Sequence, residues 1–376
     1  MATVAIVGAG PAGASAGFRL ASMDHAVTLF DRAEFPRPKT CGDWITQGAL
    51  RALEESGLPT SELLASAGAE HAVVTESLLA APNGNASEVT SADAACCIPR
   101  RVFDDILFRR AVGAGCRFVR QDVRDLAAER RTSLKEFDHV VDARGVYAGV
   151  PNCVALRGYV AADTAALEPG LSSSVRIYAD PVFRRGYGWV FPVAREGDRT
   201  RFNVGVGMWK ADSRPPERTV AHYYERFVAG NPAMRALHDA GGYSTPPRGY
   251  SLAVADGRSR VVEDGVLKIG DAANLTDPLT GEGIANAIRS GFLVAEAIDS
   301  ARSPVDAEER WRRQYADHFT RDLRAARLVR TLLEGTAAKN AAMWLLKRRP
   351  RFAERFHACL AGAYPWADLL SLSSLR

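Results

Sequence analysis

The sequence predicts an α/β (α+β) fold in which a Rossmann-like nucleotide-binding domain is interleaved with a mixed-sheet domain and followed by C-terminal helices. Two observations predict it. The chain opens with a short apolar strand, a glycine-rich turn and an Ala-rich helix (VAIVGAGPAG, 4–13), and strand-rich segments such as YGWVFPVA and RFNVGVGMW later separate helical stretches. With 376 residues, 47% of them hydrophobic, the chain is long enough to bury the core of two such domains.

The opening segment is predicted to bind a diphosphate. Gly8 makes the tight turn after the strand, Gly10 lets the backbone approach the phosphates, and Gly13 lets the helix pack against the strand. The helix N-terminus then presents unpaired N–H groups and a positive dipole end to the negative charge. The predicted contacts in this loop are Gly8, Gly10, Pro11, Ala12 and Gly13.

The second predicted strand, 26–30, runs into an acidic residue. Asp31 follows the glycines by about 20 residues, where a carboxylate is expected to accept a hydrogen bond from a ribose hydroxyl and to repel a 2′-phosphate. Arg32 beside it belongs to the same predicted site. These features alone do not distinguish a nicotinamide dinucleotide from a flavin dinucleotide.

A later segment, IGDAANLTDPLTGEGIANAI (269–288), favours a flavin. Asp271 is placed to accept a hydrogen bond from a ribityl or ribose hydroxyl, and the N–H groups of 281–284 at a helix start stabilise negative charge on a reduced isoalloxazine. A nicotinamide has no use for such a device so far from the phosphate loop. The alternative is an ordinary strand–loop–helix connection. The predicted contacts in this segment are Asp271, Pro278, Gly281, Gly283 and Ile284.

Together with RRVFDDIL (100–107), these segments resemble the FAD-binding motifs of the glutathione-reductase-type flavoproteins. The branch is that of the p-hydroxybenzoate hydroxylase-like monooxygenases, flavin-dependent halogenases and geranylgeranyl reductases. FPRPKTCGD (35–43), and GYGWVFPV (186–193) followed by FNVGVG (202–207), are similar to segments of geranylgeranyl reductases. The resemblance covers roughly residues 3–300 and implies FAD as the cofactor.

The resemblance also implies individual site residues. Arg101 is the candidate for an arginine that lies against FAD in this family, the alternative being a solvated arginine beside Arg100. Val123 follows a strand whose end offers backbone groups to adenine, and Lys39 either pairs with a phosphate or is solvated. Cys41 is a proton donor or, as we favour, a small wall beside the flavin. The further cofactor contacts predicted here are Lys39, Cys41, Gly42, Arg101 and Val123.

Aromatic residues predict the substrate pocket. Tyr187, Trp189 and Phe191 alternate along one strand, so they share a face that is directed either at the flavin or into an ordinary core. Trp44, which stands where the family has a small residue, adds an aromatic wall or narrows the pocket. No catalytic residue is assigned, and Cys41 and Trp44 are the candidates.

The chain departs from the halogenase pattern, although its VVDARG segment (140–145) is closer to that branch. Tyr187 and Phe191 stand at the positions of the first Trp and the Ile of the halogenase Trp-x-Trp-x-Ile-Pro segment, and the active-site lysine cannot be placed. Halogenation therefore ranks low.

Composition limits the other function classes. The net charge of +4 comes from scattered arginines rather than a basic stripe, which argues against nucleic-acid binding. The six cysteines and seven histidines show no metal-ligand spacing, so we expect no metal and reduced thiols. No apolar run approaches the roughly 18 residues that span a bilayer, and the N-terminus does not read as a signal peptide, so a cytoplasmic location is expected.

The predicted domain boundaries follow the chain order. Residues 1–70, 98–153 and 250–300 are assigned to the FAD-binding domain, 71–97 and 154–249 to the substrate domain, and 301–376 to a helical cap. In the cap, an apolar face (328–333 and 343–346) adjoins the basic cluster 347–351. We favour a cap over the substrate cavity, and the alternative is weak contact with an anionic membrane surface.

Three functions remain open at this point. We lean slightly to a monooxygenase that hydroxylates or epoxidises a hydrophobic or aromatic small molecule through a flavin C4a-hydroperoxide. The alternatives are reduction of isoprenoid C=C bonds, as in geranylgeranyl reductases, and a non-catalytic escort protein that binds prenyl groups. Because no second dinucleotide fingerprint is visible, NAD(P)H is expected to act as a transient reductant, or a partner protein reduces the flavin. The oligomeric state is not predicted.

Overall fold

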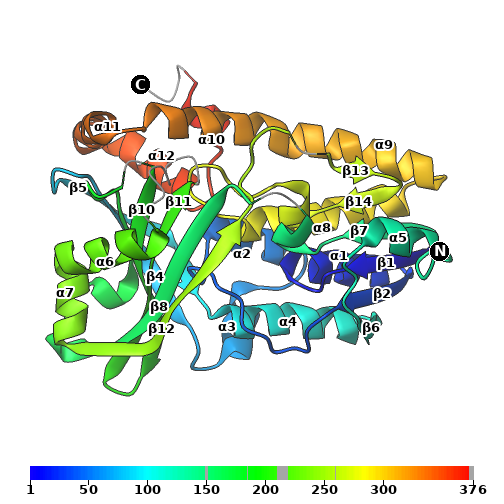
Figure 1. Cartoon of the computed structure of the whole chain (residues 1–376), viewed down its shortest axis with the longest axis horizontal. Coiled ribbons are helices and arrows are strands. Elements are labelled where there is room, and N and C mark those ends of the chain that lie inside the picture. Colours follow the sequence, from blue (N-terminus) through cyan, green and yellow to red (C-terminus); the bar gives the residue numbers. More distant parts are fainter. Residues whose placement is uncertain (149–150, 184, 210–218, 259, 372–376) are drawn as a thin grey trace.

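The chain forms two β-sheets that lie side by side, with helices packed around each (Figure 1). The computed structural model describes residues 1–148, 151–183, 185–209, 219–258 and 260–371. The predicted α/β (α+β) fold with C-terminal helices is confirmed.

The first sheet carries the glycine-rich turn. Its strand order is β13-β14-β7-β1-β2-β6, and all neighbours are parallel except the β13–β14 pair. Parallel strands buried on both faces read as continuous apolar runs, and β1 is an example of such a run. The strands are β1 (Thr3–Val7), β2 (Ala26–Asp31), β6 (Arg117–Arg120), β7 (His139–Asp142), β13 (Val262–Glu263) and β14 (Val266–Lys268).

Helices cover this sheet, and two of them approach each other closely through small residues. The helix α1 (Pro11–Ala21) packs directly on α8 (Ile284–Asp299), where a Cβ on Gly291 would lie 2.5 Å from the Ala12 carbonyl oxygen. The first and last cofactor segments therefore meet through small residues. The remaining helices on this side are α2 (Gln47–Glu55), α3 (Thr60–Ala67), α4 (Arg100–Gly113) and α5 (Leu126–Arg131).

The second sheet is larger and mixed. Its order is β12-β8-β11-β10-β9-β4-β5-β3, with β4 and β9 parallel and the other pairs antiparallel. The strands are β3 (Trp44–Ile45), β4 (Ala72–Ala80), β5 (Ala86–Cys97), β8 (Cys153–Asp163), β9 (Ser174–Tyr178), β10 (Gly186–Glu196), β11 (Arg199–Trp209) and β12 (Gly241–Leu252). Residues 44–45 and 250–252 pair with strands of this sheet. The predicted boundaries place these residues in the FAD-binding domain, but the chain passes from one half of the molecule to the other at these points.

One face of the second sheet is covered by α6 (Val220–Gly230) and α7 (Pro232–Asp239). Phe227 packs so closely that a Cβ on Gly188 of β10 would lie 2.5 Å from its ring. Thr219 caps α6 by accepting a hydrogen bond from the His222 N–H. The sequence predicts a helix around 216–229, of which residues 216–218 lie outside the described residues.

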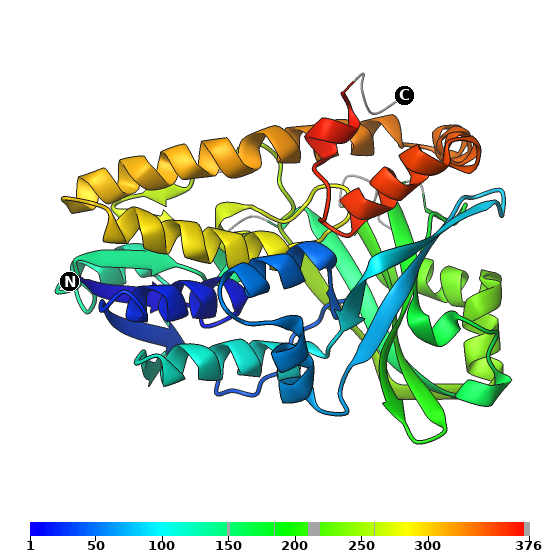
Figure 2. The same ribbon diagram turned by 180° about the vertical axis from the view of Figure 1, so that it is seen from behind.

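The C-terminal helices join the two halves. Helices α9 (Pro304–Tyr315) and α10 (Arg321–Leu332), linked by the π-helical turn Ala316–Thr320, run along one edge of the molecule from the first sheet to the second (Figure 2). They are followed by α11 (Thr336–Arg348), α12 (Pro350–Leu360) and α13 (Trp366–Leu369). Inward-facing residues such as Val329, Met343, Leu346 and Phe356 form an apolar cluster with Ile177 of the second sheet. No helix in the described part of the chain is long and apolar enough to cross a membrane.

Candidate functional site

A cavity of about 770 Å³ lies between the two sheets and gathers most of the predicted site residues. The predicted residues in its wall are Gly8, Gly10, Pro11, Ala12, Asp31, Arg32, Lys39, Cys41, Gly42, Trp44, Val123, Tyr187, Trp189, Phe191, Asp271, Gly281, Gly283 and Ile284. Gly13, Arg101 and Pro278 do not line it. Both sheets and the N-terminus of α8 therefore contribute to a single site.

The glycine-rich turn forms a cradle at one end of this cavity. Gly8 has φ +105°, and a Cβ on it would lie 2.2 Å from the Ala143 carbonyl oxygen. A Cβ on Gly13 would lie 1.8 Å from the Gly8 carbonyl oxygen, so this glycine allows α1 to pack closely on the turn that follows β1. It does not line the cavity itself. Gly10 faces the open cavity, where only the flexible Arg37 side chain comes within 3.4 Å of its Cβ position. The cradle leaves room for a diphosphate at the start of α1.

Asp31 joins this turn to the end of β2. Its Oδ2 accepts a hydrogen bond of 2.9 Å from the Ala9 N–H and its Oδ1 one of 3.0 Å from the Ala33 N–H. A carboxylate has lone pairs for further donors, so Asp31 retains capacity for a ribose hydroxyl.

The neighbouring end of the cavity holds an arginine whose role the sequence did not reveal. Arg144, of the unusual VVDARG segment, makes a bidentate contact of 2.9 and 2.8 Å with the carboxylate of Asp142. Its Nη1 also donates to the carbonyl oxygens of Val123 (3.3 Å) and Arg124 (2.6 Å). The arginine thereby fixes the backbone at Val123, where an adenine contact was predicted.

The arginine of helix α4 that reaches the cavity is Arg100, and not the predicted Arg101. Arg100 is 4% exposed, lines the cavity and pairs with Asp104 at 2.6 and 2.8 Å. Arg101 is about half exposed and pairs with Glu70. Adjacent residues on a helix diverge by about 100°, so only one of the two can face inward. The sequence offered two adjacent arginines, and only the helix orientation decides between them.

The segment 39–43 forms one wall, and a buried carboxylate anchors it. Asp43 is fully buried in the left-handed conformation (φ +65°). Its Oδ2 accepts hydrogen bonds from the Tyr159 hydroxyl (2.5 Å) and the Asn203 amide (2.7 Å), and its Oδ1 accepts one from the Arg100 N–H (3.2 Å). Burial raises the pKa of this carboxyl above its usual range, while nearby Arg157 and the donors oppose the shift.

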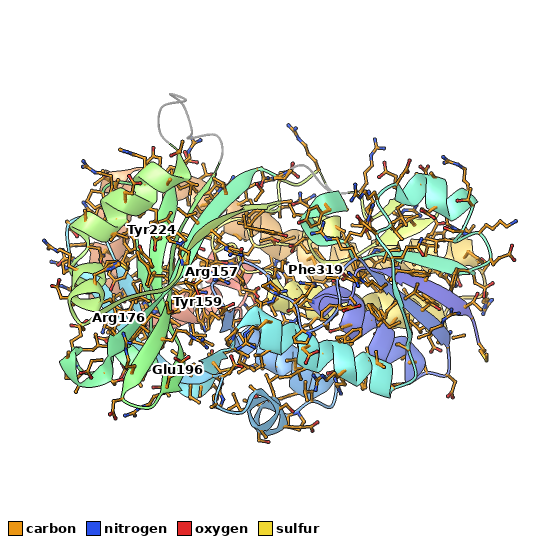
Figure 3. The ribbon with its side chains drawn as sticks, turned by 60° about the horizontal axis from the view of Figure 1, so that its bottom comes forward. Arg157, Tyr159, Arg176, Glu196, Tyr224 and Phe319 are labelled. Atoms are coloured by element: carbon orange, nitrogen blue, oxygen red, sulfur yellow. The ribbon has the colours of Figure 1, made fainter. Side chains whose placement is uncertain are left out.

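Side chains of the second sheet also hold the backbone of this wall. The Cys41 carbonyl oxygen accepts from the Asn203 Nδ2 (2.6 Å) and the Arg157 Nε (3.1 Å), and the Lys39 carbonyl oxygen accepts from the Arg157 Nη2 (3.4 Å). Figure 3 shows Arg157 and Tyr159 together on β8, at the border between the two halves. None of these anchoring residues was predicted, because they lie more than 100 residues away in the sequence.

Two charged groups in the wall have altered acidity. Burial lowers the pKa of the Lys39 ammonium, whose Nζ lies 3.8 Å from the Asp271 Oδ2. Burial raises the pKa of the Glu282 carboxyl to about 7, although its Oε1 accepts a hydrogen bond of 2.8 Å from the Ala285 N–H. Glu282 therefore changes charge near neutral pH inside the cavity.

The loop before α8 is held from three sides. Asp277 accepts hydrogen bonds of 2.8 Å from the N–H groups of Leu279 and Thr280, and one of 3.0 Å from the Trp366 Nε1 in the C-terminal cap. The Tyr187 hydroxyl of β10 donates to the Thr280 carbonyl oxygen. Pro278 faces away from the cavity, because its carbonyl oxygen is directed to Arg330 of α10 at 3.4 Å. The predicted helix start at Gly281–Ile284 is thus shaped partly by the cap.

Aromatic rings form the opposite wall. Trp189 and Phe191 are each 6% exposed and stack at 6.3 Å, and Trp44 packs on Phe191 at 5.6 Å. These rings line the cavity and also form an apolar cluster. The strand face therefore borders the cavity and is part of a core at the same time, although the sequence left these as alternatives. Trp209, which was not singled out, joins them beside Tyr187 at 6.4 Å.

An apolar annex of about 110 Å³ extends from this aromatic wall. It lies between the second sheet and helices α10–α12, and its lining includes Leu79, Leu279, Leu333, Met343, Leu346 and Phe356. Five residues line both cavities, namely Ile177, Tyr187, Trp209, Thr280 and Leu360. The cap therefore covers a space that adjoins the main cavity across these five shared residues.

Comparison with known proteins agrees with this geometry. Residues 1–139 match a family model described as an FAD binding domain. The chain is 30% identical over 358 residues to digeranylgeranylglycerophospholipid reductase 1 of Methanopyrus kandleri, covering 85% of this chain and 86% of that protein. It is 28% identical over 367 residues to menaquinone reductase of Mycobacterium tuberculosis, covering 88% and 84% of the two chains.

Solved structures share the fold. A geranylgeranyl bacteriochlorophyll reductase-like protein from Thermoplasma acidophilum superposes with a TM-score of 0.71 at 20% identity, over 100% of this chain and 95% of that one. A flavin-dependent brominase superposes with a TM-score of 0.73 at 17% identity, over 96% and 93% of the chains. The chain is a flavin-dependent oxidoreductase and belongs to the geranylgeranyl reductase family.

Proposed function

We propose that this enzyme reduces a carbon–carbon double bond of a hydrophobic, isoprenoid-bearing small molecule. The observation that carries the proposal is the apolar annex, which places an aliphatic-lined space against the aromatic wall of the main cavity. The relatives named as reductases of lipids and of menaquinone match over 85% and 88% of this chain. This weighting reverses the slight preference for oxygen insertion that the sequence suggested.

The residues at the main cavity fit FAD. The cradle at Gly10 and the start of α1 would receive the diphosphate, Asp31 a ribose, and the N-terminus of α8 the pyrimidine edge of the flavin. Bound FAD would supply hydride transfer, and NAD(P)H is the proposed transient reductant. All six cysteines are free thiols, which supports the proposed cytoplasmic location.

Cys41 is the proposed proton donor. Saturation of a double bond needs a hydride at one carbon and a proton at the other. The Cys41 thiol lines the cavity, and the buried Arg100 guanidinium lies within interaction distance of it. Solvent would return the proton afterwards. Cys41→Ser should retain flavin and lower turnover at least tenfold, whereas a wall without a proton-transfer role would leave turnover within twofold.

A second candidate function is mono-oxygenation of a compact aromatic molecule. The observation in its favour is the wall of five aromatic residues, which suits a flat ring better than an aliphatic chain. A third, non-catalytic function as a prenyl-binding escort requires the apolar annex but no flavin.

One experiment separates the three functions. Purified enzyme is reduced chemically and incubated with menaquinone-type and polyprenyl substrates, either without oxygen or under ¹⁸O₂, and the products are weighed by mass spectrometry. Gain of two hydrogen atoms without oxygen supports the reductase. Gain of one ¹⁸O atom, seen only under oxygen, replaces it with the monooxygenase. A chain that neither retains nor takes up flavin and leaves every substrate unchanged is the escort.

A further inference from the structure

The outward side of the C-terminal helices exposes large apolar side chains. Leu328 and Leu332 of α10 are 51% and 60% exposed, Trp344 of α11 is 57% exposed, and Leu370 after α13 is 42% exposed. Every leucine or tryptophan in the described part of the chain that counts as exposed belongs to this group. Such clustering of large apolar side chains on one part of a surface marks an interaction site rather than chance.

The same region holds the positive charge of the molecule. Residues 321–355 contain ten Lys and Arg but three Asp and Glu, a net charge of +7, so the rest of the chain carries −3 against the total of +4. Lys347, Arg348, Arg349 and Arg351 are exposed, and none forms an ion pair with a carboxylate of the described residues. The Arg348 guanidinium stacks on the Trp344 ring at 4.2 Å. The surface therefore combines apolar anchors with uncompensated cationic charge.

The inward side of the same two helices lines the annex. Leu333, Met343 and Leu346 face that space, while Leu328, Leu332 and Trp344 face outward. The helix pair thus separates the apolar annex from the exterior by a single layer of helices. In Figure 1 this pair forms one upper corner of the molecule, away from the first sheet.

We propose that the outward face of α10 and α11, together with the basic residues 347–351 at the junction of α11 and α12, docks on an anionic lipid bilayer. Basic side chains attract the negative surface potential, and Leu and Trp insert at the headgroup level, where tryptophan is favoured. An acidic protein would satisfy the charge but would leave unexplained why apolar side chains stand among the basic ones. Docking in this orientation places the roof of the annex against the source of a lipid-soluble substrate. The docking itself does not rest on the proposed reaction.

Co-sedimentation with vesicles tests the proposal without any activity measurement. The full chain is mixed with phosphatidylcholine vesicles with and without about one third phosphatidylglycerol, in roughly 0.1 M salt. We expect binding to the anionic vesicles and little to the neutral ones. Each basic residue near such a surface contributes about fivefold in partitioning, so the triple variant Lys347→Gln/Arg349→Gln/Arg351→Gln should lose on the order of 100-fold.

Matched controls keep the result specific. Arg109→Gln/Arg117→Gln/Arg131→Gln removes the same charge from exposed positions on α4, β6 and α5 and should bind as the parent does. Leu332→Ser should weaken binding severalfold, whereas Val305→Ser, at a 63% exposed site on α9, should not. Absence of binding to anionic vesicles, or equal losses in both triple variants, would overturn the proposal. Retention on heparin or RNA without vesicle binding would replace it with a polyanion surface.

Discussion

The two ends of the main cavity are built in different ways. At the diphosphate end, contacts run through backbone atoms of residues close in sequence, as in the 1.8 Å approach of a Gly13 Cβ position to the Gly8 carbonyl oxygen. At the substrate end, groups from three separate elements hold the wall. The Tyr159 hydroxyl of β8, the Asn203 amide of β11 and the Arg100 N–H of α4 all donate to Asp43. Backbone-determined sites leave a strict residue pattern, whereas side-chain networks admit many sequences. The difference explains why the sequence pointed to the glycine-rich turn but not to the network that anchors the wall at the substrate end.

The largest expected effect tests the backbone-determined end. In Gly13→Ala the new Cβ would lie 1.8 Å from the Gly8 carbonyl oxygen, and neither α1 nor β1 can move without disturbing the sheet. We expect a loss of about 4 kcal/mol in the free energy of unfolding, measured by urea denaturation of flavin-free protein.

Gly10→Ala is the matched control for that variant. Its Cβ meets only the flexible Arg37 side chain at 3.4 Å, so stability should change by less than about 1 kcal/mol. FAD affinity, measured by fluorescence titration, should nevertheless fall more than tenfold, because the methyl group occupies the approach to the diphosphate. Equal destabilisation by both substitutions would contradict the separate roles of packing and approach.

The prediction of site residues from sequence follows the same division. Asp31, Asp271 and Gly10, which all line the cavity, could be singled out as candidates because strand, turn and helix lie within a few residues of one another. The family resemblance pointed to Arg101, and the sequence alone does not orient a helix that begins with two arginines. Asn203 belongs to the segment FNVGVG, but its partner Asp43 is 160 residues away in the sequence. No local sequence pattern indicates such a contact.

Asp43 tests the network-determined end. Asp43→Ala would leave the Tyr159 hydroxyl and the Asn203 amide without their buried acceptor, and alanine is disfavoured at φ +65°. We expect a loss of about 3 kcal/mol in unfolding free energy and weaker FAD binding. Asp43→Asn, which keeps one acceptor and tolerates the left-handed conformation, should lose about 1 kcal/mol. If the alanine variant were no less stable than the asparagine variant, the wall would not depend on this network.

The cap should loosen at acidic pH. His357 of α12 is 4% exposed between the hydroxyls of Ser77 and Ser87, at 2.5 and 3.1 Å, and burial lowers its pKa from 6.5 to about 4. Its contribution is complete above pH 6.5 and is lost as the pH falls toward 4, because the unfolded chain binds the proton first. Between pH 8 and pH 5 this amounts to roughly 2 kcal/mol. The unfolding free energy of His357→Gln should depend less on pH in that range. If the variant lost as much stability at acidic pH as the parent, the loss would come from groups other than His357.

The flavin-facing loop should show the opposite dependence. Burial raises the pKa of Glu282 from 4.5 to about 7, so its contribution is complete below pH 4.5 and is lost as the pH rises through 7. Because the carboxyl lines an open cavity, solvent reduces the effect to about 1 kcal/mol between pH 5 and pH 8. Thermal unfolding of flavin-free protein should show this alkaline loss in the parent and not in Glu282→Gln. If the alkaline loss of stability persisted in the variant, groups other than Glu282 would cause it, and the loop would not hold a neutral carboxyl.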